Sequence, residues 1–443
     1  MTLRNAKCLL LPFYCDGYDL DVARKHIAMT VDVLRSCGAD VETADLIGSA
    51  DEAEQAASRY NAANYDLAVL FPVTWSEPRL ACLAARAFFG NPILVWCVGQ
   101  FAHEGETLEM SSLPASAALR GSLQEMGVPC EWISYLPDEG LTDGKMRKLR
   151  ALLTAARAIG LLKSTRMMFF GHNFNGITSA GFDLSVLRRR FGTEVWSTDG
   201  SELIARMKAV SEAELRSAAA LVDDKVRGDL GHKRDGVIRM TAALRSYARE
   251  YGLQAVNMRC HTEFSQTFGL TGCLALSLLG DEVITSCEAD LPVTLTQVLL
   301  HYLSGGENSA YVDLRLLEDG RVKVGACGMA PCGLCMGECA KVGGEGGYLT
   351  NASFLRPGKL TLARILKFPG GKLAIHRTAG TASGETSPLR EMGCAVYPMT
   401  QITLDTPTAE FTEHLGGNHY ALVYAGVEDA LRLFAKYSGV EIL

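Results

Sequence analysis

The sequence predicts an α/β fold in which two parallel-sheet domains precede a β-rich C-terminal domain. In residues 1–160, short and continuously apolar segments alternate with segments of helical length. The same alternation starts again after a long helix-like segment at 144–163, and beyond residue 310 it gives way to β-like segments separated by glycines. Buried parallel strands produce continuous apolar runs, whereas antiparallel strands come as short segments with turn residues between them. The predicted domains are 1–163, 164–284 and 285–443.

The first domain is expected to contain five parallel strands. The strands are expected at 8–14, 39–44, 67–71, 93–97 and 130–134, and the helices between them at 19–37, 50–61 and 77–89. Five such strands joined by short turns match a flavodoxin-like arrangement. Trp75 and Gln100 follow two of these strands, and ligands usually bind at the carboxyl ends of parallel strands. We therefore expect Trp75 to contribute to a binding site.

The second domain opens with an apolar strand at 166–170, which is followed by Gly171, His172 and Asn173. His172 and Asn173 could hydrogen-bond a polyol substrate, or they could serve only to form a turn. Further elements of this domain are expected at 180–191, 194–197, 211–221 and 235–251. In the third domain, strands are expected at 311–317, 321–325, 358–368, 372–378 and 395–399, with a closing helix at 426–437.

The composition limits the classes of partner. Hydrophobic residues make up 48% and charged residues 21% of the 443 residues, which is ordinary for a globular protein with substantial cores. The net charge of −7 argues against nucleic acid or an anionic membrane as the main partner. The apolar run at 8–14 is too short for a signal peptide, and no stretch approaches the roughly 18 apolar residues that span a bilayer. We therefore expect a cytoplasmic protein whose 14 cysteines are thiols.

Two acidic segments stand out in otherwise apolar or small-residue sequence. Glu263 closes the segment HTE, and Asp290 closes the segment CEAD. Acidic residues rarely enter apolar surroundings unless they are paired, hydrogen-bonded or bound to a metal. Asp290 also precedes Pro292 and an apolar run, so the capping of a buried helix is the structural alternative.

A third candidate is His419, in the segment GGNHY before an apolar strand at 421–424. Two carboxylates and one imidazole, contributed by Glu263, Asp290 and His419, form a ligand set suited to Mn²⁺, Mg²⁺ or Fe²⁺. Such a set leaves coordination positions open for substrate oxygens. The sequence therefore indicates a site for a divalent metal.

A cysteine cluster offers a different interpretation. Its members are Cys327, Cys332, Cys335 and Cys339. Four thiolates could hold zinc or an iron–sulfur cluster, but the gaps of four, two and three residues fit neither a paired zinc module nor the usual ferredoxin pattern. Small residues surround the cysteines, so packing in a crowded turn is the other interpretation.

Four segments of the chain form a recognisable pattern: CHTEF, SCEADLPVTLTQVLLHYLSG followed by YVDL, GGNHYALVYAG, and FFGHNFNGITSAGFDLSVLRRRFGTEV. This pattern resembles the L-fucose isomerase and L-arabinose isomerase superfamily. The resemblance implies two Rossmann-like, flavodoxin-like domains before a β-rich domain, and Mn²⁺ bound by residues that correspond to Glu263, Asp290 and His419. It also implies a homo-trimer or homo-hexamer in which the first domain covers a neighbour's site, with a role in trans for Trp75 or Gln100.

The residues and the resemblance together predict a metal-dependent aldose–ketose isomerase, an intramolecular oxidoreductase of carbohydrate metabolism. It would act on an open-chain sugar or sugar derivative through an enediolate. We assign Glu263 and Asp290 to proton transfer as well as to metal binding, without deciding which carboxylate is the base. The cofactor is expected to be Mn²⁺ or another divalent cation such as Mg²⁺, Fe²⁺ or Co²⁺. The residues expected to bind the sugar are His172, Asn173, Asn418 and Trp75.

Two other classes of function stay open. The chain could be a non-catalytic sugar-binding or regulatory protein of the same fold. It could also be a metal or redox protein based on the cysteine cluster. Metal-dependent exchange of a substrate C–H proton with solvent distinguishes an enzyme from the first class, and metal analysis with an absorption spectrum distinguishes it from the second.

Overall fold

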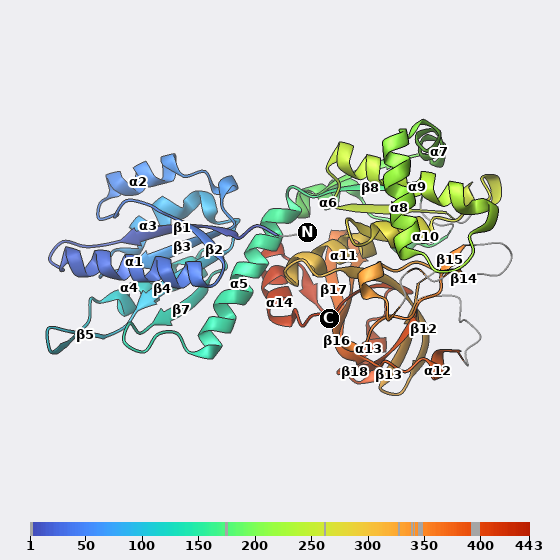
Figure 1. Cartoon of the computed structure of the whole chain (residues 1–443). Coiled ribbons are helices and arrows are strands. Elements are labelled where there is room, and N and C mark those ends of the chain that lie inside the picture. The colour runs from blue at the N-terminus through green and yellow to red at the C-terminus, as the bar shows by residue number, and fades with distance from the viewer. Residues whose placement is uncertain are drawn as a thin grey trace. The chain divides into compact units, whose positions relative to one another are not determined.

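A computed structural model describes residues 3–172, 176–260, 263–326, 328–337, 340, 342–343, 349–390 and 399–443. The chain forms two units (Figure 1). One unit consists of Leu3–Leu161 with Asp429–Gly439, and the other consists of Leu162–Glu428 with Val440–Leu443. The short helix near the C-terminus therefore belongs to the first unit.

The first unit is built around a five-stranded parallel sheet, as the sequence predicted. Its strands are β1 (Ala6–Phe13), β2 (Ala39–Thr43), β3 (Leu67–Pro72), β4 (Ile93–Val98) and β7 (Glu131–Tyr135). They lie in the order β2-β1-β3-β4-β7 and all pair in parallel, which is the flavodoxin-like order. A small hairpin of β5 (Phe101–His103) and β6 (Glu106–Leu108) was not predicted.

Helices cover both faces of this sheet, which explains why its central strands are continuously apolar. The hydrophobic layer on one face is completed by α1 (Leu20–Ser36), α5 (Asp143–Leu162) and α14 (Glu428–Ser438). The layer on the other face is completed by α2 (Ala50–Arg59), α3 (Pro78–Ala85) and α4 (Ser112–Glu125). Helix α2 begins at a capping box between Ser49 and Glu52, and such a box satisfies amide groups of the first turn.

The second unit opens with a four-stranded parallel sheet in the order β11-β10-β8-β9. Its strands are β8 (Arg166–Phe170), β9 (Glu194–Thr198), β10 (Ala255–Met258) and β11 (Ile284–Cys287). The helices that accompany it are α6 (Leu184–Phe191), α7 (Gly200–Ala209), α8 (Glu212–Lys225), α9 (Arg234–Tyr251) and α10 (Cys273–Leu279). Two short helical turns matter for the site: η3 (Thr178–Ala180) and η5 (Glu263–Thr267).

The rest of the second unit is a mainly antiparallel barrel. Its strands are β12 (Ser309–Glu318), β13 (Arg321–Gly325), β16 (Gly358–Phe368), β17 (Lys372–Ala382), β18 (Met399–Leu404), β19 (His419–Val423) and β20 (Glu441–Ile442). The strands follow the order β16-β19-β12-β13-β18-β17, and the pairing of β16 with β17 closes the ring. The prediction of a β-rich C-terminal region is confirmed. Of the strand predicted at 395–399, residues 395–398 lie outside the described part of the chain.

Helix α11 (Leu291–Leu303) joins the parallel sheet to the barrel. It packs against β10 and β11 of the sheet and against β12, β16 and β19 of the barrel. Figure 1 labels α11, β12 and β16. Every residue of α11 is buried, which explains why this helix is apolar around its whole circumference. The candidate site lies at the first turn of this helix.

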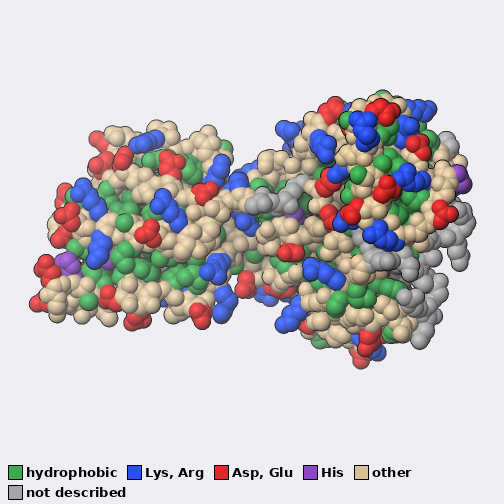
Figure 2. All heavy atoms as spheres, viewed as in Figure 1, with side chains coloured by type: hydrophobic (Ala, Val, Ile, Leu, Met, Phe, Trp, Pro, Cys, Tyr) green, Lys and Arg blue, Asp and Glu red, His purple; other side chains and the backbone are tan. Residues whose placement is uncertain are grey.

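One face of the chain mixes both signs of charge. On the face shown in Figure 2, Lys and Arg side chains are interspersed with Asp and Glu side chains. Among the described helices, none combines the length and the apolar character needed to cross a membrane.

Candidate functional site

The link between β11 and α11 has an unusual backbone. Glu288 and Ala289 follow the last residue of β11, and both have positive φ, at 58° and 55°. Residues with a Cβ rarely adopt this left-handed region. Each such residue costs on the order of 1–3 kcal/mol, which the surrounding structure must offset. Such strain is concentrated at binding and catalytic sites.

Asn257, on β10, holds this link in place. Its side chain is fully buried, and its Oδ1 accepts a hydrogen bond of 2.8 Å from the backbone N–H of Ala289. Its Nδ2 donates to Oγ1 of Thr294 at 2.8 Å and to the backbone oxygen of Asp290 at 3.4 Å. One amide therefore fixes the strained link and the first turn of α11 together.

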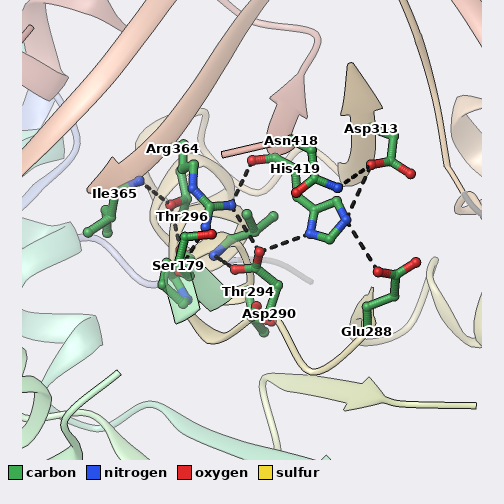
Figure 3. Close-up of polar contacts among 12 residues, drawn as sticks. Ser179, Glu288, Asp290, Thr294, Thr296, Asp313, Arg364, Ile365, Asn418 and His419 are labelled. Atoms are coloured by element: carbon green, nitrogen blue, oxygen red, sulfur yellow. Dashed lines mark hydrogen bonds and ion pairs between the residues drawn. The ribbon is translucent and has the colours of Figure 1, made fainter. Parts of the chain in front are cut away.

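Asp290 is the N-cap of α11 and also bridges two other side chains (Figure 3). Its Oδ1 accepts from the backbone N–H of Val293 at 3.0 Å. Its Oδ2 accepts from Nδ1 of His419 at 2.9 Å and from Nη1 of Arg364 at 3.0 Å. The side chain is 0% exposed. Burial acts to raise the pKa of Asp290, but the hydrogen bond from His419 and the charge of Arg364 outweigh it and lower the pKa.

His419 presents its other ring nitrogen to two further carboxylates. Its Nε2 lies 3.2 Å from Oδ1 of Asp313 and 3.4 Å from Oε2 of Glu288 (Figure 3). Asp313 pairs with His419 in the β12–β19 register, so neighbouring strands bring the two residues together. The ring of Tyr311 packs against the imidazole at a centroid distance of 4.7 Å.

The three carboxylates determine the protonation of His419. Burial acts to lower the pKa of the imidazole, but the hydrogen bond to Asp290 and the nearby Asp313 and Glu288 outweigh it. Together they raise the pKa to about 11. In the protein without a bound cation, the ring is therefore an imidazolium.

Glu288, Asp313 and His419 fit a divalent metal ion. Their ligand atoms lie within 4.8 Å of one another, and theirs is the only such group of three or more found among the described residues. His419 Nε2 is buried and has no well-aligned hydrogen bond, although it faces both carboxylates. Two carboxylate oxygens and an imidazole nitrogen are typical ligands for Mn²⁺, Fe²⁺ or Mg²⁺. An ion would pair with the buried nitrogen and balance the acidic charge.

The structure brings together only part of the predicted site. Asp290 and His419 are in contact, but Asp290 lies beside Nδ1, whereas Glu288 and Asp313 lie beside Nε2. Asn418 was expected to bind substrate, and its Nδ2 donates to Oδ1 of Asp313 at 2.9 Å. In this arrangement, Asn418 fixes the orientation of a carboxylate.

The remaining predicted residues lie elsewhere or outside the described part. The backbone of Glu263 begins η5, and its side chain is not described. Asn173 lies outside the described residues. His172 follows β8, is 80% exposed, and has Nε2 3.8 Å from Oδ1 of Asp199. Trp75 follows β3 in the first unit and is 40% exposed.

Three residues of the site were not singled out from the sequence: Glu288, Asp313 and Arg364. Glu288 belongs to the CEAD segment, in which only Asp290 was chosen. Asp313 and Arg364 are the single charges of two apolar segments, AYVDL and LTLARIL. A charged residue in such a strand indicates a paired or liganded side chain, and this signal could have identified both.

At one described position, the cysteine segment differs from the expectation of thiols. Cys332, in η6 (Cys332–Leu334), forms a disulfide, whereas ten other described cysteines are thiols. The Cys335 thiol lies 3.5 Å from the backbone oxygen of Pro331 and 3.7 Å from Nδ2 of Asn351. Cys327 and Cys339 lie outside the described residues.

Comparison with known proteins gives distant relatives that share one name. No family model matches the chain. A sulfoquinovose isomerase of Alkalicoccus urumqiensis is 25% identical over 377 residues, which cover 81% of this chain and 82% of the relative. One of Clostridium sp. (strain MSTE9) is 24% identical over 80% of this chain and 81% of its own, and one of Priestia aryabhattai is 21% identical over 97% of both.

Structural comparison adds little. A solute-binding protein of an ABC transporter from Burkholderia multivorans covers 67% of this chain and 93% of its own, with 12% identity. Its TM-score of 0.19 is too low to indicate a shared fold.

The sulfoquinovose isomerases confirm the prediction of an enzyme, an intramolecular oxidoreductase of the isomerase class. The narrower resemblance to L-fucose and L-arabinose isomerases stays a prediction.

Proposed function

We propose that the chain is a divalent-cation-dependent aldose–ketose isomerase that acts on an open-chain sugar, with sulfoquinovose as the first candidate substrate. The observation that supports this most directly is the arrangement of His419, whose Nε2 faces Glu288 and Asp313 in a buried site. The candidate substrate comes from the shared name of the relatives.

Glu288, Asp313 and His419 would hold the cation, with Mn²⁺ as the first choice and Mg²⁺, Fe²⁺ or Co²⁺ as alternatives. When bound, the cation would supply positive charge beside the carbonyl and hydroxyl oxygens of the open-chain sugar. The side chains of Glu288 and Asp313 are each 12% exposed, whereas that of His419 is 1% exposed. Substrate would therefore approach from the side of the two carboxylates.

Asp290 would serve the site through His419. Its Oδ2 accepts from Nδ1 of His419, which places the proton of a neutral ring on Nδ1 and leaves the Nε2 lone pair directed at Glu288 and Asp313. A carboxylate that orients a metal-binding histidine in this way raises the basicity of the ligand nitrogen. Asp290 is fully buried, and both of its carboxylate oxygens accept hydrogen bonds. We therefore propose that Asp290 orients His419, in place of the roles of metal ligand and acid/base group predicted from the sequence.

Isomerisation requires a proton to leave C2 of the aldose and a proton to arrive at C1. As the C2–H bond breaks, its electrons form the C1–C2 double bond of the enediolate, and the π electrons of the C1 carbonyl move to O1. The hydroxyl proton then moves from O2 to O1, the carbonyl forms at C2, and the electrons of the C1–C2 double bond take up a proton at C1. A carboxylate within reach of both carbons can take the first proton and return it. We retain Glu263 for this role and add Glu288 as the second candidate.

The other predicted roles remain part of the proposal through the family resemblance. His172 and Asn173 would contact the sugar from the second unit. Trp75 would contribute from the first unit of a neighbouring copy in a homo-trimer or homo-hexamer. A cytoplasmic location belongs to the same proposal.

The proposal is tested by following isomerisation in deuterated solvent. The purified protein is freed of metal with a chelator, supplied with Mn²⁺, and incubated in turn with sulfoquinovose, L-fucose and L-arabinose, while ¹H NMR follows the aldose and ketose signals. We expect conversion of at least one sugar, with deuterium incorporated at C1 or C2, and no conversion in the presence of chelator. A sugar that binds without exchange or conversion would instead indicate the non-catalytic alternative.

A further inference from the structure

Arg364, on β16, is a buried charge that the proposed reaction does not use. Its side chain is 1% exposed. Burial of an arginine is rare unless the guanidinium is paired and hydrogen-bonded, because its desolvation is costly. The partners of Arg364 therefore indicate why the charge is kept inside.

The guanidinium donates to three separate parts of the second unit (Figure 3). Nη1 donates to Oδ2 of Asp290 at 3.0 Å and to the backbone oxygen of His419 at 2.8 Å. Nη2 donates to the backbone oxygen of Ser179, in η3, at 2.9 Å. One planar group thus joins the cap of α11, the start of β19 and the η3 turn. A lysine ammonium cannot reproduce this fork geometry.

The guanidinium of Arg364 lies so close to the backbone of Gly417 that this position has no space for a side chain. A Cβ added at Gly417 would lie 2.7 Å from Nε and 2.8 Å from Cζ of Arg364. Any side chain at this position would force the guanidinium to move. Gly417 also lies two residues before His419, so the fit of Arg364 depends on the same loop that presents the imidazole.

Lys367, on the same strand, holds the same turn without touching the site. Its Nζ donates to the backbone oxygen of Thr178 at 3.2 Å and to that of Gly181. The segment 178–181 is therefore fixed to β16 by both cations. Only Arg364 also contacts Asp290 and His419.

From these contacts we propose that Arg364 is a positioning residue that ties the orientation of the Asp290–His419 pair to the placement of segment 178–181. In the sequence, this segment follows His172 and Asn173, which are proposed to contact the sugar. The Asp290–His419 pair and segment 178–181 would then keep one arrangement relative to each other. The inference rests on the proposed function for the roles of the cation and the sugar.

The experiment compares R364K with K367M. Mn²⁺ alone is titrated into each metal-free protein by calorimetry, and hydrogen exchange of the peptide that contains 178–181 is followed by mass spectrometry. We expect R364K to bind Mn²⁺ about 10–100-fold more weakly than wild type, the usual effect of losing a group that orients metal ligands. Exchange at 178–181 should become faster in both variants. Mn²⁺ affinity should be unchanged in K367M, because this variant keeps the contacts of Arg364 with Asp290 and His419.

A second variant guards against misfolding of R364K. G417A keeps the arginine but displaces its guanidinium, and it should weaken Mn²⁺ binding and speed exchange at 178–181 in the same way. Wild-type Mn²⁺ affinity or wild-type exchange in folded R364K would overturn the inference. If the wild-type protein binds no Mn²⁺, the proposed function fails, and exchange in metal-free R364K still decides whether Arg364 fixes the turn.

Discussion

Oδ2 of Asp290 accepts a hydrogen bond from Nδ1 of His419 at 2.9 Å, although 129 residues separate the two in the chain. The contact joins the cap of α11 to the first residue of a barrel strand. It leaves Nε2 of the imidazole facing Glu288 and Asp313. The helix cap and the candidate metal site are therefore parts of one buried network, and changes to the cap are expected to change metal binding.

Replacement of Asp290 by Asn should impair both stability and metal binding. The variant leaves Arg364 buried without its carboxylate, and breaking such a buried pair typically costs about 3–5 kcal/mol. Loss of the carboxylate that orients His419 should weaken Mn²⁺ binding by about 10–100-fold. Urea unfolding and calorimetric titration measure the two effects. A folded D290N protein with wild-type affinity and turnover would contradict the role given to Asp290.

Replacement of Glu288 by Gln should reduce turnover strongly while the protein stays folded. Glu288 lies at the accessible side of the site, and its amide analogue can neither carry the charge nor take a proton. We expect turnover to fall by about 10²–10⁴-fold, the usual range for loss of a positioned acid or base. E263Q should show a loss of the same order if Glu263 is the base.

A matched control exists for both glutamine variants. Glu307 is 53% exposed and pairs with Arg356 at 3.8 Å, away from the site. E307Q should keep wild-type turnover and stability, because an exposed ion pair contributes little to either. Full activity in E288Q together with full activity in E263Q would exclude proton transfer by these two carboxylates.

Much of the fold could be predicted from the sequence because local patterns determine it. The continuous apolar runs around β1, β3 and β4 predicted a covered parallel sheet, and the glycine-separated segments predicted β13 and β16 with the bounds observed. The limit predicted between the second and third domains stays a prediction. Strand β11 crosses the predicted boundary at residue 284, because it pairs with β10 of the parallel sheet.

The site could be predicted only in part, because backbone details decide which side chain faces which atom. Glu288 and Asp290 of the segment CEAD face different nitrogens of His419. The alternation of side chains along a strand does not predict this, because the positive φ of Glu288 and Ala289 redirects the chain between the two residues. The position of Asp313 opposite His419 depends on strand register. Such register is set by long-range pairing, which a single sequence does not reveal.

Metal binding should release a proton and grow stronger with rising pH. The pKa of His419 is raised from 6.5 to about 11 in the metal-free protein, so the imidazolium must lose its proton when a cation binds at Nε2. Affinity for Mn²⁺ should therefore increase by about tenfold per pH unit around neutrality. Titrations in buffers with different ionisation enthalpies measure the released proton. Identical heats in all buffers would contradict the assignment of His419 as a ligand.

The stability of the metal-free protein should fall with rising pH, whereas the affinity for Mn²⁺ rises. A group with a raised pKa contributes its full stabilisation below its unfolded value, and it loses this contribution as the pH rises towards the folded value. For His419 the window runs from 6.5 to about 11. The free energy of unfolding of the chelator-treated protein should fall across this window, and saturating Mn²⁺ should remove most of the decrease. Denaturant titrations at several pH values provide the measurement.

Replacement of Asn257 by Ala should release the strained link between β11 and α11. The variant leaves the buried N–H of Ala289 without its acceptor, and such an unsatisfied group costs about 1–3 kcal/mol. Once freed, Glu288 should also leave its place beside His419, so Mn²⁺ affinity should fall together with stability.

A289G is the matched comparison for N257A, because glycine adopts a positive φ without strain. Combining the two changes should cost less stability than the sum of the single effects, since glycine removes the strain that Asn257 opposes. Additive losses in this double-mutant cycle, measured by urea unfolding, would show that Asn257 stabilises the fold without holding the backbone of Glu288 and Ala289.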